Sequence, residues 1–456
     1  MSARRVLVAA RGEIAVRIIR ALRDMGITSV AVYSKEDTSA MHVRLADYRV
    51  CIGEGSGRHS YMNVSNIITA ALNFGCDAIH PGYGFLSENA DFAETCRNNG
   101  LIFIGPEPET IRRMGNKQEA RSLMKAAGVP VVPGSDSPLH DVREARKAAE
   151  AIGWPVMIKA ILGGGGKGMR ECRSPQRFEQ DFSMAQSEAV NAFSDDAMYL
   201  EKLVEDPRHV EVQILADQFG HIITLGDRDC SVQRNHQKLI EESPSPAISD
   251  ETRTQMYRDA VNAAAAANYT GAGTVEFIID RDGSYYFLEM NTRIQVEHGV
   301  TEMETDTDIV TEQISIAYGE PLSLKQEDVM MHGHTIECRI NAEIPEKGFI
   351  PSPGTIRNLH LPGGNGVRVD TALYTGYTVP SEYDSMIAKI IVHAKDRESA
   401  IMKMRTALDE TVISGVDTNL DLQYKILHSD AFCSGTADTG FVNQFVMGGT
   451  VHEDRL

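Results

Sequence analysis

The sequence predicts a protein of mixed α/β and α+β class that is built from three domains. Its 456 residues are enough for about three domains of the usual size. Strand and helix patterns alternate in the first part, hairpin patterns fill the middle, and alternating strands follow in the last part. We therefore divide the chain into residues 1–115, 116–330 and 331–446, with residues 447–456 as a tail.

The composition is acidic and excludes several classes of partner. Asp and Glu number 64 against 45 Lys and Arg, which gives a formal charge of −19. Such a surface repels phosphate backbones and anionic lipids, so we expect neither nucleic acid nor membrane as a partner. No apolar run reaches the ~18 residues of a membrane-spanning helix. The seven scattered cysteines never form a C-x-x-C pair, which favours a reducing compartment and predicts a cytoplasmic protein.

The first 115 residues carry the pattern of a parallel sheet. Residues 6–10 form a short apolar run, and residues 29–33 form a second one. Between them Ile14, Ile18 and Leu22 recur at helical spacing, and Gly26 ends the helix. A strand, a crossover helix and a second strand this close together predict a parallel pair. The same rhythm recurs at residues 67–72, 78–80 and 102–104.

The rest of the chain predicts an antiparallel middle part and a β-rich end. A helix over residues 116–127 precedes Pro130, and a glycine-rich loop lies between two strands. Hairpin patterns are typical of an α+β layer. The strands that we expect cover residues 156–160, 198–203, 210–216, 222–225, 275–279, 285–290, 334–341, 355–360 and 387–392, and a last helix covers residues 398–412.

The loop at residues 163–168 is the first candidate site. It reads GGGGKG, with Gly163, Gly164, Gly165, Gly166 and Gly168 around Lys167. A dinucleotide-binding turn would open a helix at the last glycine, and a P-loop would continue with Lys-Ser or Lys-Thr, so neither fits. A loop rich in backbone N–H groups and without side-chain bulk favours a lid over phosphates. A plain flexible turn is the alternative.

A pair of carboxylates is predicted on a hairpin in the middle part. Asp282-Gly283 is a two-residue turn signal between two strand-like runs. With that turn, Ile278 faces Phe287 and Glu276 faces Glu289, which brings two like charges together. A divalent cation such as Mg²⁺ or Mn²⁺ would bind such an oxygen-only pair. Two solvated acids on an edge ribbon, or a different register, are the alternatives.

Polar residues continue with the same parity beyond this hairpin. Asn291, Arg293, Gln295 and Glu297 fall on one side of the chain, which is typical of a site lining rather than a core face. Arg293 offers a planar fork for a small carboxylate-like anion, and Glu297 is a candidate general base. A salt bridge between Arg293 and Glu297 is the structural alternative.

Long segments of the chain resemble the biotin carboxylase family. They are ARGEIAVRIIRA at 10–21, HPGYGFLSEN at 80–89, GGGGKGM at 163–169, PRHVEVQ at 207–213, RDCSVQRNHQK at 228–238, EMNTRIQVEH at 289–298, ECRINAE at 337–343 and FIPSPG at 349–354. The resemblance implies an ATP-grasp fold with a mobile lid at about residues 131–204, a preceding α/β domain and a β-rich C-terminal domain. It also implies the activity: ATP and Mg²⁺ or Mn²⁺, as two ions, turn bicarbonate into carboxyphosphate, and biotin on a carrier protein is then carboxylated.

Roles for individual residues follow from the same resemblance. Arg339 would stabilise the biotin enolate, and Glu297 would deprotonate bicarbonate. The bicarbonate ligands would be Lys238, Arg293, Gln295 and the Val296 backbone. The metal ligands would be Glu276, Glu289 and Asn291. The nucleotide contacts would be Lys117, Lys159, the loop Gly163, Gly164, Gly165, Gly166 and Gly168, then Glu201, Lys202, Val204, His209, Gln233 and His236, together with Glu276 and Glu289.

The chain also departs from the family pattern. Ala10 replaces the usual Asn, Asp227 a Glu, Asn235 a basic residue, Gly299 a Pro, and Thr305-Asp306-Thr307 a Thr-Gly-Val. Lys403 imitates the Met-Lys-Met sequence that accepts biotin, but Ile401, Met404, Leu408 and Val412 predict a helix with Lys403 on its polar face. We therefore expect biotin to come from a separate carrier protein, and a carboxyltransferase to be a further partner.

Two other functions stay open at this point. The first is another ATP-grasp ligase, in which an amine captures an acyl phosphate; residues 293–298 and 337–343 argue against it, because they match the bicarbonate and biotin side. The second is a catalytically silent relative that scaffolds a carboxylase complex. Members of this family are commonly homodimers, so the resemblance implies a homodimer. It also implies that the assembled enzyme is of the acetyl-CoA carboxylase type.

Overall fold

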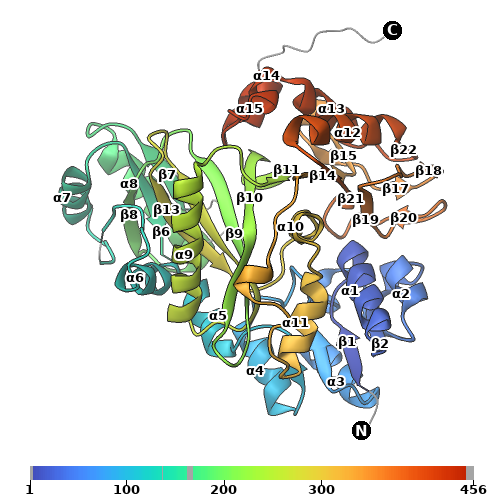
Figure 1. Cartoon of the computed structure of the whole chain (residues 1–456). Coiled ribbons are helices and arrows are strands. Elements are labelled where there is room, and N and C mark those ends of the chain that lie inside the picture. The colour runs from blue at the N-terminus through green and yellow to red at the C-terminus, as the bar shows by residue number, and fades with distance from the viewer. Residues whose placement is uncertain (1–3, 136, 162–167, 448–456) are drawn as a thin grey trace.

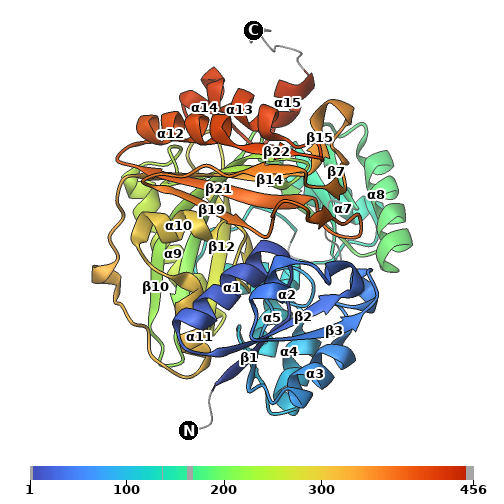
Figure 2. The same cartoon turned by 90° about the vertical axis from the view of Figure 1, so that its right-hand side faces the viewer.

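The first unit of the protein is a parallel sheet covered by helices on both faces. The structure is a computed structural model that describes residues 4–135, 137–161 and 168–447. Strands of this unit pair in the order β3-β2-β1-β4-β5 (Figures 1 and 2). Its elements are β1 (Arg5–Val8), α1 (Gly12–Asp24), β2 (Thr28–Ser34), α2 (Met41–Leu45), β3 (Tyr48–Gly53), α3 (Val64–Asn73), β4 (Ala78–His80), α4 (Ala90–Asn98), β5 (Ile102–Phe103) and α5 (Pro108–Gly115).

Helix α1 is the element of this unit that approaches the rest of the molecule. It lies between the N-terminal sheet and a sheet of the C-terminal part, as Figure 2 shows. Its apolar face, with Ile14, Ile18 and Leu22, packs into a core shared with the middle part. Its other buried side chains include Glu13 and Arg17, so α1 brings charged groups to the junction of the three units.

The middle part has two lobes. The small lobe at the left of Figure 1 holds a sheet in the order β7-β6-β8 against two helices. The larger lobe holds the long antiparallel strands and α9. The alanines of α9 pack against one face of the sheet that these strands form. The elements are α6 (Lys117–Ala126), α7 (Val142–Ile152), β6 (Val156–Ala160), β7 (Met169–Cys172), α8 (Phe178–Phe193), β8 (Met198–Lys202), β9 (Arg208–Ala216), β10 (Ile222–Arg234), β11 (Gln237–Ser243), α9 (Asp250–Ala266), β12 (Gly271–Ile279), β13 (Tyr285–Asn291), α10 (His298–Thr305) and α11 (Ile309–Ala317).

The C-terminal part continues the same large sheet. This sheet has eight strands, in the order β13-β12-β9-β10-β11-β14-β21-β19. Strand β11 of the middle part therefore pairs directly with β14 of the C-terminal part. The elements are β14 (His334–Asn341), β15 (Glu343–Ile344), β16 (Ile350–Pro351), β17 (Gly354–Thr355), β18 (Asn358–His360), β19 (Val367–Thr371), β20 (Thr378–Val379), β21 (Met386–Ala394), α12 (Arg397–Glu410), β22 (Val412–Ser414), α13 (Leu420–His428), α14 (Asp430–Cys433) and α15 (Phe441–Met447).

Most predicted elements are present, and some bounds are corrected. The predicted helix over residues 398–412 ends at Glu410, because Val412 leaves it to pair with His360 in a short ladder. The predicted strand over 355–360 is two short strands with different partners. The predicted strand at 222–225 continues to Arg234. None of the described helices is long and apolar enough to cross a membrane.

Candidate active site

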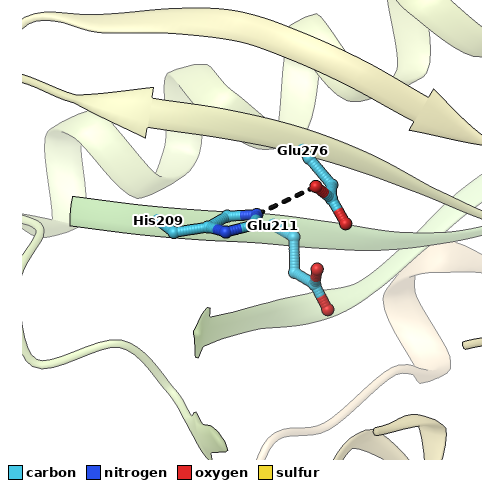
Figure 3. A group of neighbouring side chains, drawn as sticks. All are labelled: His209, Glu211 and Glu276. Atoms are coloured by element: carbon cyan, nitrogen blue, oxygen red, sulfur yellow. Dashed lines mark ion pairs between the residues drawn. The ribbon is translucent and has the colours of Figure 1, made fainter. Parts of the chain in front are cut away.

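The candidate site lies on one face of the large sheet, where it meets the loop that follows β13. Strand β9 shows why this face is polar: His209, Glu211 and Gln213 alternate along it and are all buried. Pairing places Glu211 beside Glu276 on one neighbouring strand and beside Arg228 on the other. Figure 3 shows His209, Glu211 and Glu276 together, with His209 Nε2 3.0 Å from Glu276 Oε2.

The predicted carboxylate pair is present, but the predicted turn is wrong. Glu276 pairs with Glu289 as expected. The turn contains three residues rather than two, since the Asp280 N–H donates to the Ser284 carbonyl and Gly283 takes a positive φ of 84°. Phe287 consequently faces Phe277 instead of Ile278.

A bulge restores the register next to the carboxylates. The ladder shifts by one residue between Glu276 and Phe277, so Leu288 is the extra residue on β13. The three-residue turn and this bulge cancel each other. The Glu276–Glu289 pair therefore forms although the strand pairs nearer the turn differ from the prediction.

Lys238 is the centre of the site. Its ammonium lies 2.6 Å from Glu211 Oε2, 3.0 Å from Glu276 Oε1 and 2.6 Å from Glu297 Oε1. Burial would lower the pKa of Lys238, but the surrounding acidic groups raise it well above its ordinary value. Burial likewise opposes the charge of Glu276, yet Lys238 and His209 hold its pKa well below the usual range. The cluster is thus a charged one.

Glu297 and Arg339 extend this cluster toward the C-terminal part. Arg339 Nη2 donates to Glu297 Oε2 at 2.9 Å, and Arg339 Nε donates to Glu241 Oε1 at 2.6 Å. Burial works against the charged form of Glu297, but Lys238 and Arg339 hold its pKa well below the ordinary value. Burial raises the pKa of Glu241 to about 7. Glu297 is therefore a carboxylate between two cations.

Arg293 and the neighbouring amides lie at the edge of the site. Strand β13 ends at Asn291, yet Gln295 still points inward and donates to Glu276 Oε1 at 2.8 Å. The alternative salt bridge between Arg293 and Glu297 is not the pair that the structure contains: Arg293 Nε donates to Glu88 Oε2 at 2.8 Å. Asn291 Nδ2 donates to Glu276 Oε1 at 2.9 Å.

Most of the predicted nucleotide contacts lie in or beside the small lobe. Lys117 starts α6 and its charge acts on Glu289. Lys159 on β6 forms an ion pair with Glu201 on β8. Lys202 donates to the backbone carbonyl of Trp154 at 2.7 Å, and Val204, 8% exposed, follows the strand. Gly163, Gly164, Gly165 and Gly166 lie outside the described residues, whereas Gly168 is buried against Ala160.

Two predicted nucleotide contacts are on the hairpin that carries Lys238. Gln233 pairs with Lys238 across the ladder and is buried beside His209. His236 is exposed at the turn. Asn235 and His236 both have positive φ values, 48° and 64°, as a two-residue hairpin turn requires. Asn tolerates this conformation well, which accounts for its place here.

The residues of the hairpin fit a divalent cation. Glu276 and Glu289 stand on adjacent strands with Asn291 two residues further along, which is an oxygen-rich donor set of the kind Mg²⁺ prefers. The nearby charge of Glu276 raises the pKa of Glu289, which lies exposed on β13. A cation between the two carboxylates would remove the repulsion that raises it.

Several residues of the site were not predicted from the sequence. Glu211, Arg228 and Glu241 are buried partners of the proposed site residues. The alternation of His209, Glu211 and Gln213 in an otherwise apolar strand was a usable signal. Glu88 lies 205 positions from Arg293 in the chain, and no local pattern connects such a pair.

The departures from the family pattern are accommodated by local contacts. Asp227 accepts hydrogen bonds from Arg253 Nε at 2.8 Å and from the Tyr257 hydroxyl at 2.6 Å, so it anchors α9. A Cβ on Gly299 would lie 2.5 Å from Ile391 Cδ1, so the glycine leaves room for that side chain. Asp306 adopts a φ of 54° after α10.

Comparisons with known proteins identify the family of the chain. Family models match along the chain: the biotin carboxylase N-terminal domain at residues 2–111, the carbamoyl-phosphate synthase L chain ATP-binding domain at 116–325, and the biotin carboxylase C-terminal domain at 337–444. Biotin carboxylase 1 of Bacillus subtilis is 55% identical over 447 residues, which cover 98% of this chain and 99% of that protein. The chloroplastic biotin carboxylase of Arabidopsis thaliana is 54% identical, covering 96% and 82%.

Solved structures give the same result. The biotin carboxylase–beta-gamma-ATP complex of Campylobacter jejuni has a TM-score of 0.93 and 46% identity, and the match covers 97% of this chain and 98% of that one. The biotin carboxylase domain dimer of Hydrogenobacter thermophilus 2-oxoglutarate carboxylase, with MgADP, ADP and bicarbonate, has a TM-score of 0.92 and 48% identity, covering 97% of both. The family models, these relatives and the shared fold show that the chain belongs to the biotin carboxylase family.

Proposed function

We propose that this protein carboxylates biotin on a separate carrier protein, using ATP and bicarbonate. The observation that carries the proposal is the position of Lys238 between two sets of residues. On one side it contacts Glu276 of the carboxylate pair, and on the other it contacts Glu297, which holds Arg339. A phosphate site and an acid–base site are therefore joined through one ammonium.

The nucleotide half of the site would hold ATP. Lys117, Lys159 and the glycine loop would bind the phosphates, and Glu201, Lys202 and Val204 would line the adenine with His209, Gln233 and His236 further along. Glu276, Glu289 and Asn291 would hold Mg²⁺ or Mn²⁺, which supplies positive charge to the transferring phosphate. The relatives solved with MgADP and with beta-gamma-ATP support this assignment.

The other half would hold bicarbonate and biotin. Arg293, Gln295, Lys238 and the Val296 backbone would position bicarbonate, and Glu297 would remove its proton. A bicarbonate oxygen then attacks the γ-phosphorus, ADP leaves, and carboxyphosphate forms. The C–O bond of carboxyphosphate then breaks, and its carboxyl group passes to a ureido nitrogen of biotin. Inorganic phosphate leaves and takes up the proton of that ureido N–H, and Arg339 would stabilise the biotin enolate oxyanion.

The proposal includes the organisation of the protein. Residues 1–115, 116–330 and 331–446 would act as the three domains, with residues 131–204 as the lid. A biotin carboxyl carrier protein and a carboxyltransferase would be partners, and two copies of the chain would form a homodimer, as in the H. thermophilus structure. We assign to this protein the first half-reaction of an assembled acetyl-CoA carboxylase.

One assay tests the proposal against its alternatives. ADP release is measured with Mg²⁺, with and without bicarbonate, and with free biotin added, and carboxybiotin is measured in parallel. We expect bicarbonate-dependent ADP release and carboxybiotin formation. Release that needs an amine instead of biotin would identify another ATP-grasp ligase, and no release at all would identify a silent scaffold.

A further inference from the structure

The turn that carries Glu297 is held from the C-terminal part of the molecule. Glu297 is the N-cap residue of α10, and residues 295–298 form a turn in which the His298 N–H donates to the Gln295 carbonyl at 3.3 Å. The Val296 carbonyl points out of this turn. Lys389 Nζ on β21 donates to it at 2.5 Å.

Lys389 is a buried ammonium at the junction of the three units. Its side chain is 0% exposed, and its neighbours across the ladders are Arg339 on β14 and Asp370 on β19. Its charge faces Glu13 Oε1 at 3.5 Å and Asp370 Oδ2 at 3.7 Å. Burial would lower the pKa of Lys389, but these acids and Glu337 raise it, so the group donates as an ammonium.

The contact fixes the position of the proposed base. The Val296 carbonyl belongs to the peptide plane that ends at the Glu297 Cα, because a peptide bond is planar. Anchoring that oxygen therefore sets where the Glu297 side chain starts and how the Glu297 N–H, which lies in the same plane, is directed. A hydrogen bond from a charged donor is stronger than a neutral one, which suits this purpose.

We infer that Lys389 is a positioning residue for the bicarbonate step, holding the Val296–Glu297 peptide from the C-terminal part. The inference rests on the proposed function and adds a residue that touches neither ATP nor bicarbonate. A misplacement of about 1 Å can cost on the order of a hundredfold in rate. Through this contact, the position of Glu297, the proposed general base in the middle part, depends on strand β21 of the C-terminal part.

The test compares two lysines with similar contacts. Lys389→Met removes the ammonium and keeps a long side chain. Lys403→Met is the matched control, since Lys403 Nζ also donates to backbone carbonyls, those of Asn365 and His393, but on α12. For each purified full-length variant, the KM values for ATP and bicarbonate and the kcat of ADP release are measured.

The expected result is a split between the two substrates. Lys389→Met should lower kcat/KM for bicarbonate by about 10- to 100-fold and change the KM for ATP by less than about twofold. Lys403→Met should leave both constants unchanged. Unaltered bicarbonate kinetics in Lys389→Met, or an equal rise of both KM values, would overturn the inference.

A second variant separates positioning from folding. Lys389→Met leaves buried carboxylates without their cation, so Lys389→Met/Asp370→Asn is compared with Asp370→Asn alone. The double variant should show the same loss in kcat/KM for bicarbonate relative to Asp370→Asn. If neither Lys389 variant folds, the residue is structural and the inference fails. If the wild-type protein shows no bicarbonate-dependent ADP release, the proposed function fails instead.

Discussion

Lys238 is a largely buried cation in a protein whose formal charge is −19, and three carboxylates surround it. The acidic surface repels bicarbonate and nucleotide, so the positive charges must be gathered locally. Lys238, Arg228 and Arg339 are all buried or nearly so and are paired with glutamates. These pairs keep the cations charged in a desolvated place. An incoming anion therefore meets cations that are already in position.

Glu297 and Arg339 should separate the two halves of the reaction. Glu297→Gln removes the base, so bicarbonate-dependent ATP hydrolysis should disappear. Arg339→Ala should keep much of the biotin-independent ATPase but lose transfer to biotin, at a cost on the order of 3 kcal/mol, roughly a hundredfold in rate. The KM for ATP should change little in Arg339→Ala. ADP release and carboxybiotin formation are measured side by side.

The ion pair between these residues adds a pH effect. Arg339 is one of the charges that hold the pKa of Glu297 low. Its removal should raise that pKa, so the acid limb of the bicarbonate-dependent ATPase should move to higher pH in Arg339→Ala. Equal loss of both activities would instead place Arg339 in the phosphate or bicarbonate site.

Glu304 should make stability depend on pH. It is 1% exposed on α10, and burial raises its pKa to about 7 although Thr335 donates to it at 2.9 Å. An acid whose pKa is higher in the folded state loses stability as the pH rises from its ordinary value, about 4.5, through about 7. Glu304→Gln should therefore gain about 1–3 kcal/mol at pH 8 and little at pH 4 in chemical denaturation. An equal effect at both pH values would contradict this.

Among the individual site residues, the sequence predicted those that belong to one continuous segment with a regular spacing. Glu276, Glu289, Asn291 and Gln295 follow from a single hairpin and its continuation, and the structure brings them together. Glu241 and Lys389 come from strands of a different part of the chain. Their proximity depends on the β11–β14 and β14–β21 pairings, which no local spacing determines.

The β12–β13 hairpin shows the same lesson for elements. The existence of the hairpin and its Glu276–Glu289 pair were predictable from the sequence. The three-residue turn and the compensating bulge were not, because Gly283 and Leu288 are compatible with these backbone conformations but do not require them. Strands β4, β6 and β14 have the predicted bounds. Helix α12 ends before its predicted end because Val412 pairs with His360 in a short ladder. The helical spacing of apolar residues does not predict such a tertiary contact.

The hairpin carboxylates should respond differently to substitution. Glu276→Gln and Glu289→Gln should both weaken Mg²⁺-dependent ATP cleavage, which is measured as ADP release against Mg²⁺ concentration. Glu289→Gln relieves repulsion, so the metal-free protein should be as stable or slightly more stable. Glu276→Gln removes the partner of Lys238 and His209, so it should be less stable. An unchanged metal requirement in both variants would refute the metal assignment.

Helix α12 should carry no biotin. Lys403 lies on its surface with its ammonium bound to the carbonyls of Asn365 and His393, whereas an acceptor lysine needs a free position at a hairpin tip. The purified chain, co-expressed with a biotin ligase, should be blank on an avidin blot. A band that disappears in Lys403→Arg would show that the helix is no obstacle to modification.

At the scale of the whole molecule, charged residues join the three units. Glu302 on α10 accepts from Arg17 of α1 at 2.9 Å and from Arg368 of β19 at 2.7 Å. All three side chains are largely buried. The relative placement of the units is thus fixed by polar contacts as well as by the shared apolar core.

Glu302→Gln should weaken this junction. It removes the carboxylate that the two arginines share, but Arg17 keeps Asp308 and Arg368 keeps Asp370 as partners. The loss should therefore cost about 1.5–3 kcal/mol and lower the midpoint of thermal unfolding. Arg112→Ala is the control, because its three carboxylate partners are exposed and should contribute about 1 kcal/mol or less. Similar midpoints for the two variants would mean that the units do not depend on Glu302.

The pairing of β11 with β14 has a consequence for any attempt to take the protein apart. The middle and C-terminal parts are one continuous sheet, so cutting the gene between them leaves each piece with a bare strand edge. Open edges of this kind recruit other strands, and fragments expressed alone would aggregate or pair with copies of themselves. For the same reason, recombination that exchanged one of these parts would have to preserve both matching edges, so the two parts are expected to be inherited together.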